Sequence, residues 1–183
     1  MSNIKRIFIL GHPGAGKGLF AQSIAKVVGW TFINADLELE HKLGCPIETI
    51  IGLEGLNEYN KTQFKLIKKL QEKQHIVIAT DGPILNNPKT FEAFSSSNDL
   101  LVYLATSTDT QLDRSKRSAS HLLLGSLEAL YDKLHQLRDE SFKKYCHLII
   151  DGNHSDIDYQ VKQVIDKAEI DKLDDENILT EKD

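Results

Sequence analysis

The segment with the clearest chemical meaning is GHPGAGKG, from Gly11 to Gly18. Its glycines let the backbone curl so that successive N–H groups point inward, and a lysine placed like Lys17 reaches the β- and γ-phosphates of a nucleotide. An apolar stretch precedes the segment and a helical pattern follows it, so the start of a helix adds partial positive charge for an anion. The sequence therefore predicts a phosphate-binding P-loop formed by Gly11, Gly14, Ala15, Gly16, Lys17, Gly18 and Leu19.

This loop lacks one group that such loops normally carry. The Ser or Thr that follows the lysine and ligates Mg²⁺ is replaced by Gly18, and Leu19 has no hydroxyl either. Mg²⁺ would then depend on other groups. Asp36 and Asp81 each follow a short apolar stretch, which places them at the strand ends where ligands of such sheets bind. Asp36 is also a candidate base or ligand for an acceptor hydroxyl. The simpler alternatives are a helix N-cap for Asp36 and a turn residue for Asp81, and His12 is predicted to be tolerated rather than catalytic.

The elements that must position these residues are short apolar strands alternating with helices. The predicted strands cover residues 4–10, 30–33, 75–80, 100–105 and 147–151. The predicted helices cover 17–28, a stretch from about 36, one opened by Pro46, one ending near 72, then 88–94, 107–117, 126–145 with Ser126 as its cap, and 156–168. Such alternation predicts an α/β, three-layer P-loop NTPase fold: a five-stranded parallel sheet flanked by helices, with ligands at the carboxyl ends of its strands.

Length, charge and cysteine content narrow the protein class. The chain has 183 residues, which suits a single domain over 1–170 with a lid at about 118–126 and an acidic, disordered tail over 171–183. A net charge of -5 argues against nucleic acid as a partner, and the N-terminal apolar stretch is too short for a membrane span or signal peptide. Its two cysteines have no zinc-ligand spacing and suit a reducing compartment. We therefore expect a cytoplasmic monomer or weak homodimer with a small-molecule substrate.

Five further segments extend the pattern along the chain: FINADLELE (32–40), EKQHIVIATDGP (72–83), LLVYLATSTDTQLDRSKR (100–117), QLRDESF (136–142) and GNHSD (152–156). In order and spacing they resemble the shikimate kinase family from Ile4 to about Ile165. The resemblance implies that Arg114 and Arg117 approach the nucleotide and that Arg138 binds a substrate carboxylate. It also implies that GNHSD lies beside the adenine.

The departures from that family cluster at the substrate site. Asn34 replaces the first of two strand-end aspartates, and Asn60 replaces an arginine that binds carboxylate. His121 replaces a lid arginine, and Asp81-Gly82-Pro83 replaces three glycines. The last segment also resembles the Asp-Gly-x-Pro of adenylate kinases, whose aspartate supports Mg²⁺ through water.

The leading hypothesis is an ATP-dependent phosphotransferase of the shikimate kinase type, in which Lys17 and Asp36 are catalytic and Mg²⁺ is supported by Asp36 and Asp81. Its acceptor would be a small anionic metabolite, with shikimate itself disfavoured by Asn60 and Pro83. The predicted substrate-binding residues are Asp36, Asn60, Asp81, Gly82, His121 and Arg138. Two alternatives remain open: a catalytically impaired nucleotide-binding protein, and a nucleoside or nucleotide kinase.

Overall fold

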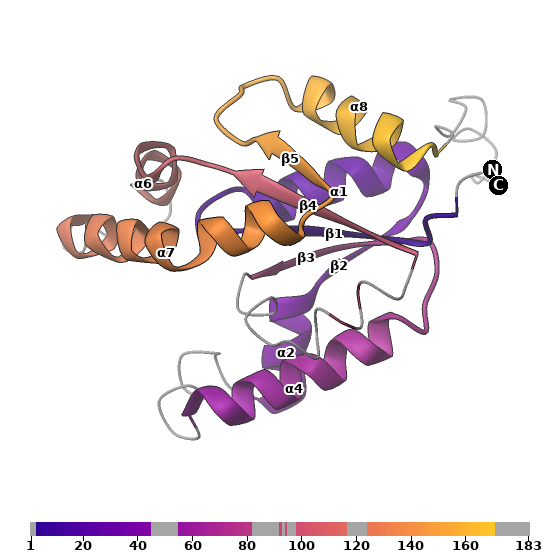
Figure 1. Cartoon of the computed structure of the whole chain (residues 1–183), viewed down its shortest axis with the longest axis horizontal. Helices are drawn as coiled ribbons and strands as arrows, with labels where there is room; N and C mark the ends of the chain where they lie inside the picture. The colour runs from indigo at the N-terminus through magenta and orange to yellow at the C-terminus, as the bar shows by residue number, and fades with distance from the viewer. Residues whose placement is uncertain are drawn as a thin grey trace, which may run out of the picture.

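The computed structural model describes residues 3–44, 55–81, 92, 94, 98–116 and 124–170, and at its centre lies one parallel sheet. Its strands are β1 (Arg6–Gly11), β2 (Thr31–Asn34), β3 (Ile76–Asp81), β4 (Asp99–Ala105) and β5 (Leu148–Asp151). They lie in the order β2-β3-β1-β4-β5, and each neighbouring pair is parallel (Figure 1). The predicted five-stranded parallel sheet is therefore confirmed.

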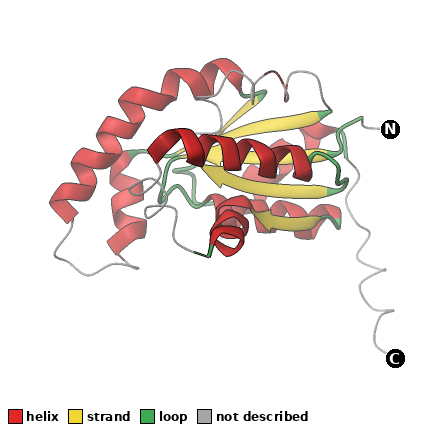
Figure 2. Ribbon diagram, turned by 90° about the horizontal axis from the view of Figure 1, so that it is seen from below, coloured by secondary structure: helices red, strands yellow, loops and turns green. Residues whose placement is uncertain are grey.

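Helices cover both faces of this sheet (Figures 1 and 2). They are α1 (Lys17–Val28), α2 (Ala35–Leu43), α4 (Gly55–Leu70), α6 (Thr108–Lys116), α7 (Leu124–Tyr145) and α8 (Ile157–Ala168). Ile7 and Ile9 of β1 belong to a core with α1 and α8, whereas Phe8 and Leu10 belong to a second core with α2, α4 and α7. Because successive side chains of a strand point to opposite faces, the unbroken apolar run of β1 is what burial on both sides requires.

Several element ends differ from the predictions by one or two residues, the usual uncertainty of helix ends. The difference matters most in α7, which begins at Leu124, so Ser126 lies inside its first turn instead of capping it. The end of the predicted lid, residues 124–126, is accordingly helical. The remainder of the lid, the helix predicted at Pro46 and the tail over 171–183 lie outside the described residues. So does the helix predicted over 88–94, except for residues 92 and 94.

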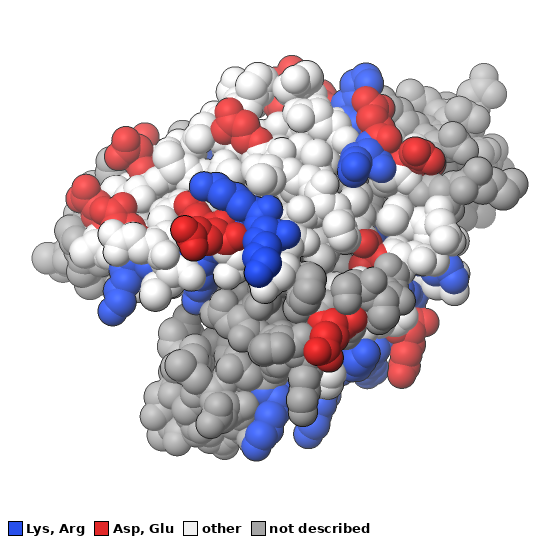
Figure 3. All heavy atoms as spheres, viewed as in Figure 1, with Lys and Arg blue, Asp and Glu red and all other residues white. Residues whose placement is uncertain are grey.

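On the face shown in Figure 3, acidic and basic side chains are interspersed over the described residues instead of forming one basic surface. Among the described helices, none is both long enough and apolar enough to cross a membrane.

Candidate active site

The loop between β1 and α1 has the backbone conformation of a phosphate cradle. Gly14 and Gly16 have φ angles of 75° and 91°, which L side chains rarely adopt. Gly16 caps α1, and the first turn of that helix contains no acidic residue that would compete with a bound anion. Lys17 is 9% exposed, and its Nζ donates to the carbonyl of His12 at 3.0 Å. The amides, the helix N-terminus and the ammonium group thus converge on one loop, which suits phosphate.

Gly18 and Leu19 lie just beyond this cradle and differ from each other in their surroundings. A Cβ added at Gly18 would have no heavy atom within 4 Å among the described residues, and its φ is not positive. Leu19 is 66% exposed and forms part of a cavity wall. Packing among the described residues therefore does not require glycine at position 18.

Arg114 of α6 joins the phosphate loop to the loop after β5. Its Nη1 donates to the carbonyl of Ala15, and its Nη2 donates to the carbonyl of Gly152 at 2.8 Å. The guanidinium lies close enough to Gly16 that a Cβ there would approach Nη1 to 3.2 Å. Because it is always charged, Arg114 holds a positive charge beside the cradle in addition to bridging two loops.

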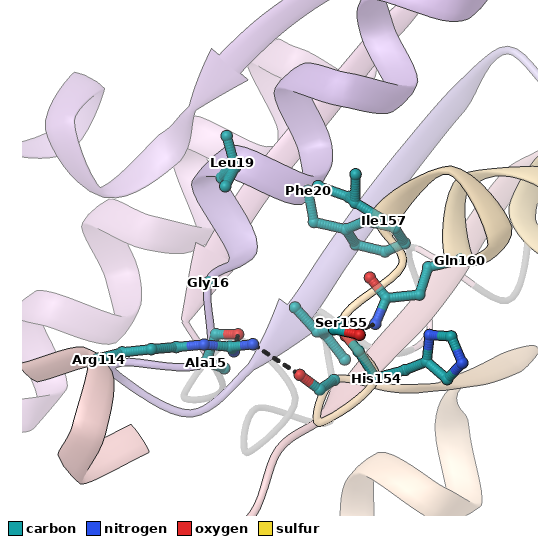
Figure 4. Close-up of a pocket in the computed structure, with 11 residues that line it drawn as sticks. Ala15, Gly16, Leu19, Phe20, Arg114, His154, Ser155, Ile157 and Gln160 are labelled. Atoms are coloured by element: carbon teal, nitrogen blue, oxygen red, sulfur yellow. Dashed lines mark hydrogen bonds between the residues drawn. The ribbon is translucent and has the colours of Figure 1, made fainter. Parts of the chain in front are cut away.

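A cavity of about 390 Å³ opens between the phosphate loop and the start of α8 (Figure 4). Its lining combines apolar side chains with polar groups: Ala15, Gly16, Leu19, Phe20, Leu104, Arg114, Gly152, His154, Ser155, Ile157 and Gln160. Figure 4 shows Arg114 at the phosphate-loop side and His154 and Gln160 across from it. A mostly apolar cavity with a few directed polar groups, next to a phosphate cradle, is suited to the base of a nucleotide.

Hydrogen bonds to and from its backbone hold the loop after β5 in place. Gln160 of α8 is buried and donates to the carbonyls of Asp151 at 2.6 Å and His154 at 3.1 Å. Gly152 N donates to the carbonyl of Ala105 at 2.6 Å. A Cβ at Gly152 would lie 2.1 Å from Thr106 Oγ1, so only glycine fits there. The cavity wall on this side is therefore rigidly positioned.

The acceptor side of the site begins where β2 and β3 end. The side chain of Asn34 caps α2 by accepting from the backbone N–H of Asp36 and of Leu37, both at 3.2 Å. Asp36 is therefore not the cap, and the alternative role considered for it is wrong. Its half-buried carboxylate accepts from Thr80 Oγ1 at 3.5 Å, while Asp81 pairs in register with Gly11. Both aspartates thus lie at the carboxyl edge of the sheet, as predicted.

His12, in the phosphate loop, is more involved in the structure than predicted. It is fully buried, and its Nε2 lies 2.7 Å from Asp139 Oδ1 of α7. Tyr103 OH donates to the same oxygen at 2.8 Å, and His135 Nδ1 lies 3.1 Å from both oxygens of Asp139. The phosphate loop is therefore tied to α7, the helix that also carries Arg138.

Burial and hydrogen bonding set the charge states of this group. Burial lowers the pKa of His12, although its hydrogen bond with Asp139 acts in the opposite direction. Burial alone would raise the pKa of Asp139, but the hydrogen bonds with His12, Tyr103 and His135 outweigh it and hold that pKa below its usual value. Burial raises the pKa of Tyr103. Asp139 is consequently the anion and Tyr103 a neutral donor at neutral pH.

Comparison with known proteins agrees with this geometry. The shikimate kinase family model matches residues 13–169, which contain most of the phosphate loop and all the elements after it. The chain belongs to the shikimate kinase family. A shikimate kinase of Wigglesworthia glossinidia brevipalpis is 34% identical over 149 residues, covering 80% of this chain and 86% of that protein. One from Legionella pneumophila (strain Corby) is 30% identical over 165 residues, covering 90% of each.

A solved structure of a shikimate kinase from Acinetobacter baumannii in complex with shikimate has the same fold. It is 25% identical, superposes with a TM-score of 0.78, and covers 90% of this chain and 92% of that one. The prediction of a P-loop kinase of the shikimate kinase type is thereby confirmed. Kinases of this family use ATP and act on a small molecule. The comparisons do not favour the alternatives of an impaired nucleotide-binding protein or a nucleoside or nucleotide kinase.

The structure brings together only part of the set of residues predicted for this kinase site. The loop from Gly11 to Leu19, Arg114 and the carboxyl ends of β2 and β3 all lie along one edge of the sheet. For Asn60 and Asp81 the backbone alone is described, and Arg117, Gly82 and His121 lie outside the described residues. Arg138 lies near enough to His12 to lower the pKa of that histidine.

Sequence reasoning missed several side chains around the site. Gln160, Thr106 and Gln111 are buried polar residues that fix the loops, and Asp139, His135 and Tyr103 hold His12. Gln160 gives a usable signal, because it is a polar residue on the otherwise apolar stripe of α8 beside Val161 and Val164. For Asp139 the sequence offers no such signal, since an aspartate within a helix is ordinarily exposed.

Proposed function

We propose that this protein transfers the γ-phosphoryl group of ATP to a hydroxyl group of shikimate. The observation that carries the proposal is the phosphate cradle, with Lys17 buried inside it, in a chain matched by the shikimate kinase family over residues 13–169. The Acinetobacter baumannii relative that binds shikimate supports this acceptor over other small anionic metabolites.

On the nucleotide side, the loop amides and Lys17 bind the β- and γ-phosphates, and Arg114 adds positive charge beside them. The adenine occupies the cavity next to Leu19 and His154. Arg117, three residues beyond Arg114, is proposed to approach the nucleotide as well, as the family resemblance implies. All these groups bind and orient ATP, and none needs to form a covalent bond with it.

The residues on the acceptor side fit a role for Mg²⁺ held between nucleotide and protein. Carboxylates are hard oxygen ligands of the kind Mg²⁺ prefers, and Asp36 and Asp81 lie at neighbouring strand ends. Gly18 leaves open space where a ligating hydroxyl normally stands. When bound, Mg²⁺ neutralises charge on the phosphates.

The acceptor hydroxyl is proposed to lie against Asp36, which orients it and takes its proton as the oxygen attacks the γ-phosphorus. Arg138 binds the carboxylate of the acceptor, with Asn60, Asp81, Gly82 and His121 completing the substrate site. Arg138 then lacks the second arginine that the family supplies, because Asn60 stands in its place. We therefore expect weak binding of shikimate with the same chemistry.

Steady-state kinetics with ATP, Mg²⁺ and shikimate test this proposal, with formation of ADP and of phosphorylated shikimate both measured. The protein should phosphorylate shikimate and leave nucleosides and nucleoside monophosphates unchanged. Asn60→Arg should lower KM for shikimate by roughly tenfold, the gain of one charged hydrogen bond, with little effect on KM for ATP. Asn57→Arg, a change of the same type on α4 at a position with no assigned role, serves as control.

Two results would contradict the proposal in different ways. Binding of ATP, seen as a raised melting temperature, without transfer to shikimate at any concentration would favour a nucleotide-binding protein. Transfer to a nucleoside would favour a nucleoside kinase.

We further propose that the protein works in the cytoplasm as a monomer or weak homodimer.

A further inference from the structure

Three potential metal-binding side chains meet beside the phosphate cradle, where the phosphate loop contacts α7. His12, His135 and Asp139 each offer one nitrogen or oxygen atom, and these three atoms all lie within 4.8 Å of one another. His12 is fully buried, whereas the side chains of His135 and Asp139 are 19% and 27% exposed. The cluster is therefore enclosed on the phosphate-loop side and accessible from the α7 side.

The hydrogen bonds around His135 determine which of its nitrogens carries a hydrogen. Gln111 Nε2 donates to the carbonyl of Pro13 at 2.6 Å, so Gln111 Oε1 is the atom that faces His135 Nε2, at 2.7 Å. Because Oε1 can only accept, His135 Nε2 must carry the hydrogen. In a neutral ring, His135 Nδ1 then has a free lone pair.

That lone pair points at a carboxylate. His135 Nδ1 lies 3.1 Å from both oxygens of Asp139, but a hydrogen bond between them needs a hydrogen that neither this tautomer of the neutral imidazole nor the ionised carboxylate carries. Two acceptors at this separation repel each other unless a positive charge lies between them. A second proton on His135 or a bound cation would supply it.

We propose that His12 Nε2, His135 Nδ1 and the carboxylate of Asp139 form a binding site for a divalent transition-metal ion, with Zn²⁺ as its best match. Two imidazoles and a carboxylate, with water in the remaining position, form a known ligand set for Zn²⁺. Imidazole ligands select Zn²⁺ over Mg²⁺, which prefers oxygen. This site is thus distinct from the one proposed for nucleotide-bound Mg²⁺.

All three ligand atoms lie within 4.8 Å of one another, and their separations must change when an ion binds. At metal–ligand distances of about 2.1 Å, the ligand atoms of a tetrahedral site lie roughly 3.4 Å apart. His12 Nε2 and Asp139 Oδ1 are 2.7 Å apart, and His135 Nδ1 and Asp139 Oδ1 are 3.1 Å apart. The exposed side of Asp139 gives an ion access to the cluster.

Surrounding groups hold two of these ligands in place. Gln111 accepts from the far nitrogen of His135, and Tyr103 donates to Asp139, which are the outer contacts that orient metal ligands. For His12, ligation through Nε2 puts the hydrogen on Nδ1, a buried nitrogen without a hydrogen-bond partner among the described residues. His12 is therefore a weaker ligand than His135.

Occupancy would join the phosphate loop to two helices, α6 and α7, that come much later in the sequence. His12 belongs to the phosphate loop, His135 and Asp139 to α7, and Gln111 links α6 to both through His135 and Pro13. An ion that binds only the folded chain raises its stability by mass action. The expected consequence is a phosphate loop held more firmly against α7 by an ion whose three ligands do not line the nucleotide cavity.

Calorimetric titration of the untagged, EDTA-treated and dialysed full chain with ZnCl2, without nucleotide, tests the site. We expect one equivalent of Zn²⁺ to bind per chain and to raise the melting temperature. Co²⁺ should give the intense visible absorption of a four-coordinate site. His135→Gln and Asp139→Asn should each weaken Zn²⁺ binding by at least about 100-fold, beyond the loss that follows removal of an outer contact.

His41→Gln is the matched control, because it removes an exposed histidine of α2 and leaves the cluster intact. It should bind Zn²⁺ as the unmodified chain does. Should Asp139→Asn fail to fold, the half-buried His135 still provides the test. Equal Zn²⁺ binding by His135→Gln and the unmodified chain would overturn the proposal. The absence of any Zn²⁺-induced change in stability would also overturn the proposal. The positive charge between His135 Nδ1 and Asp139 would then be a proton.

Discussion

Gly18 offers a sharp test of the phosphate loop, because a hydroxyl group can be restored there at little structural cost. Position 18 is the second residue of α1, has no positive φ, and has no described heavy atom within 4 Å of an added Cβ. Gly18→Ser introduces the hydroxyl that normally ligates Mg²⁺ in such loops. Gly18→Ala adds the same Cβ without the hydroxyl and is the matched control.

The two variants separate helix propensity from metal binding. Replacing a helical glycine by alanine stabilises a protein by about 0.5–1 kcal/mol, which is roughly 1–4 °C in melting temperature for a chain of this size. Serine should give about half that gain. The hydroxyl should strengthen binding of MgATP relative to metal-free ATP by roughly tenfold, the effect of one net contact with a charged group.

Calorimetric titration with ATP in the presence of Mg²⁺ and of EDTA measures both affinities for each variant. We expect the ratio of the two affinities to rise in Gly18→Ser and to stay unchanged in Gly18→Ala. An equal ratio in both variants would refute the reasoning, because the hydroxyl would then not reach the metal. A fall in stability of Gly18→Ala would refute the open space assigned to this position.

Three further predictions concern the cradle, the cavity wall and pH. Lys17→Ala should abolish the rise in melting temperature that ATP causes. The control Lys26→Ala, which removes an exposed lysine, should retain that rise. ATP binding by Lys17→Ala would contradict the phosphate-loop assignment. Gly152→Ala should lose about 1–3 kcal/mol in urea unfolding, because the new Cβ would overlap Thr106; unchanged stability would show that the cavity wall adapts. Below pH 6.5 the free energy of unfolding in EDTA should fall, because the unfolded chain binds a proton that the buried His12 of the folded chain does not. His12→Gln should make this free energy less dependent on pH. An equally steep pH dependence in the variant would show that other groups cause it.

The phosphate loop and the five-stranded parallel sheet could be predicted because their signals are local, whereas the order of the strands was not predicted. Gly14, Gly16 and Lys17 must stand at a fixed spacing between a strand and a helix, and the structure places them so. Apolar runs of four to eight residues alternating with helical periodicity allow few arrangements other than a parallel sheet. The strand ends then bring Asp36 and Asp81 to the same edge without further information.

Helix capping shows where local reasoning was insufficient. Both Asn34 and Asp36 are good capping residues, but the sequence analysis considered only Asp36 as a cap, as the alternative to a functional role. The structure assigns the cap to Asn34, because β2 continues through Asn34 and α2 begins at the next residue. The Asp36 side chain, within the first turn of α2, accepts a hydrogen bond from Thr80 Oγ1.

The sequence by itself thus determined the fold class, the nucleotide-phosphate loop and the kinase family. Only the tertiary structure decided that Arg114 bridges two loops and that His12 meets Asp139, 127 positions away. Such contacts depend on how α6 and α7 pack against the end of the sheet, and buried polar atoms then pair with whatever partner packing brings near. No spacing rule along the chain encodes that choice.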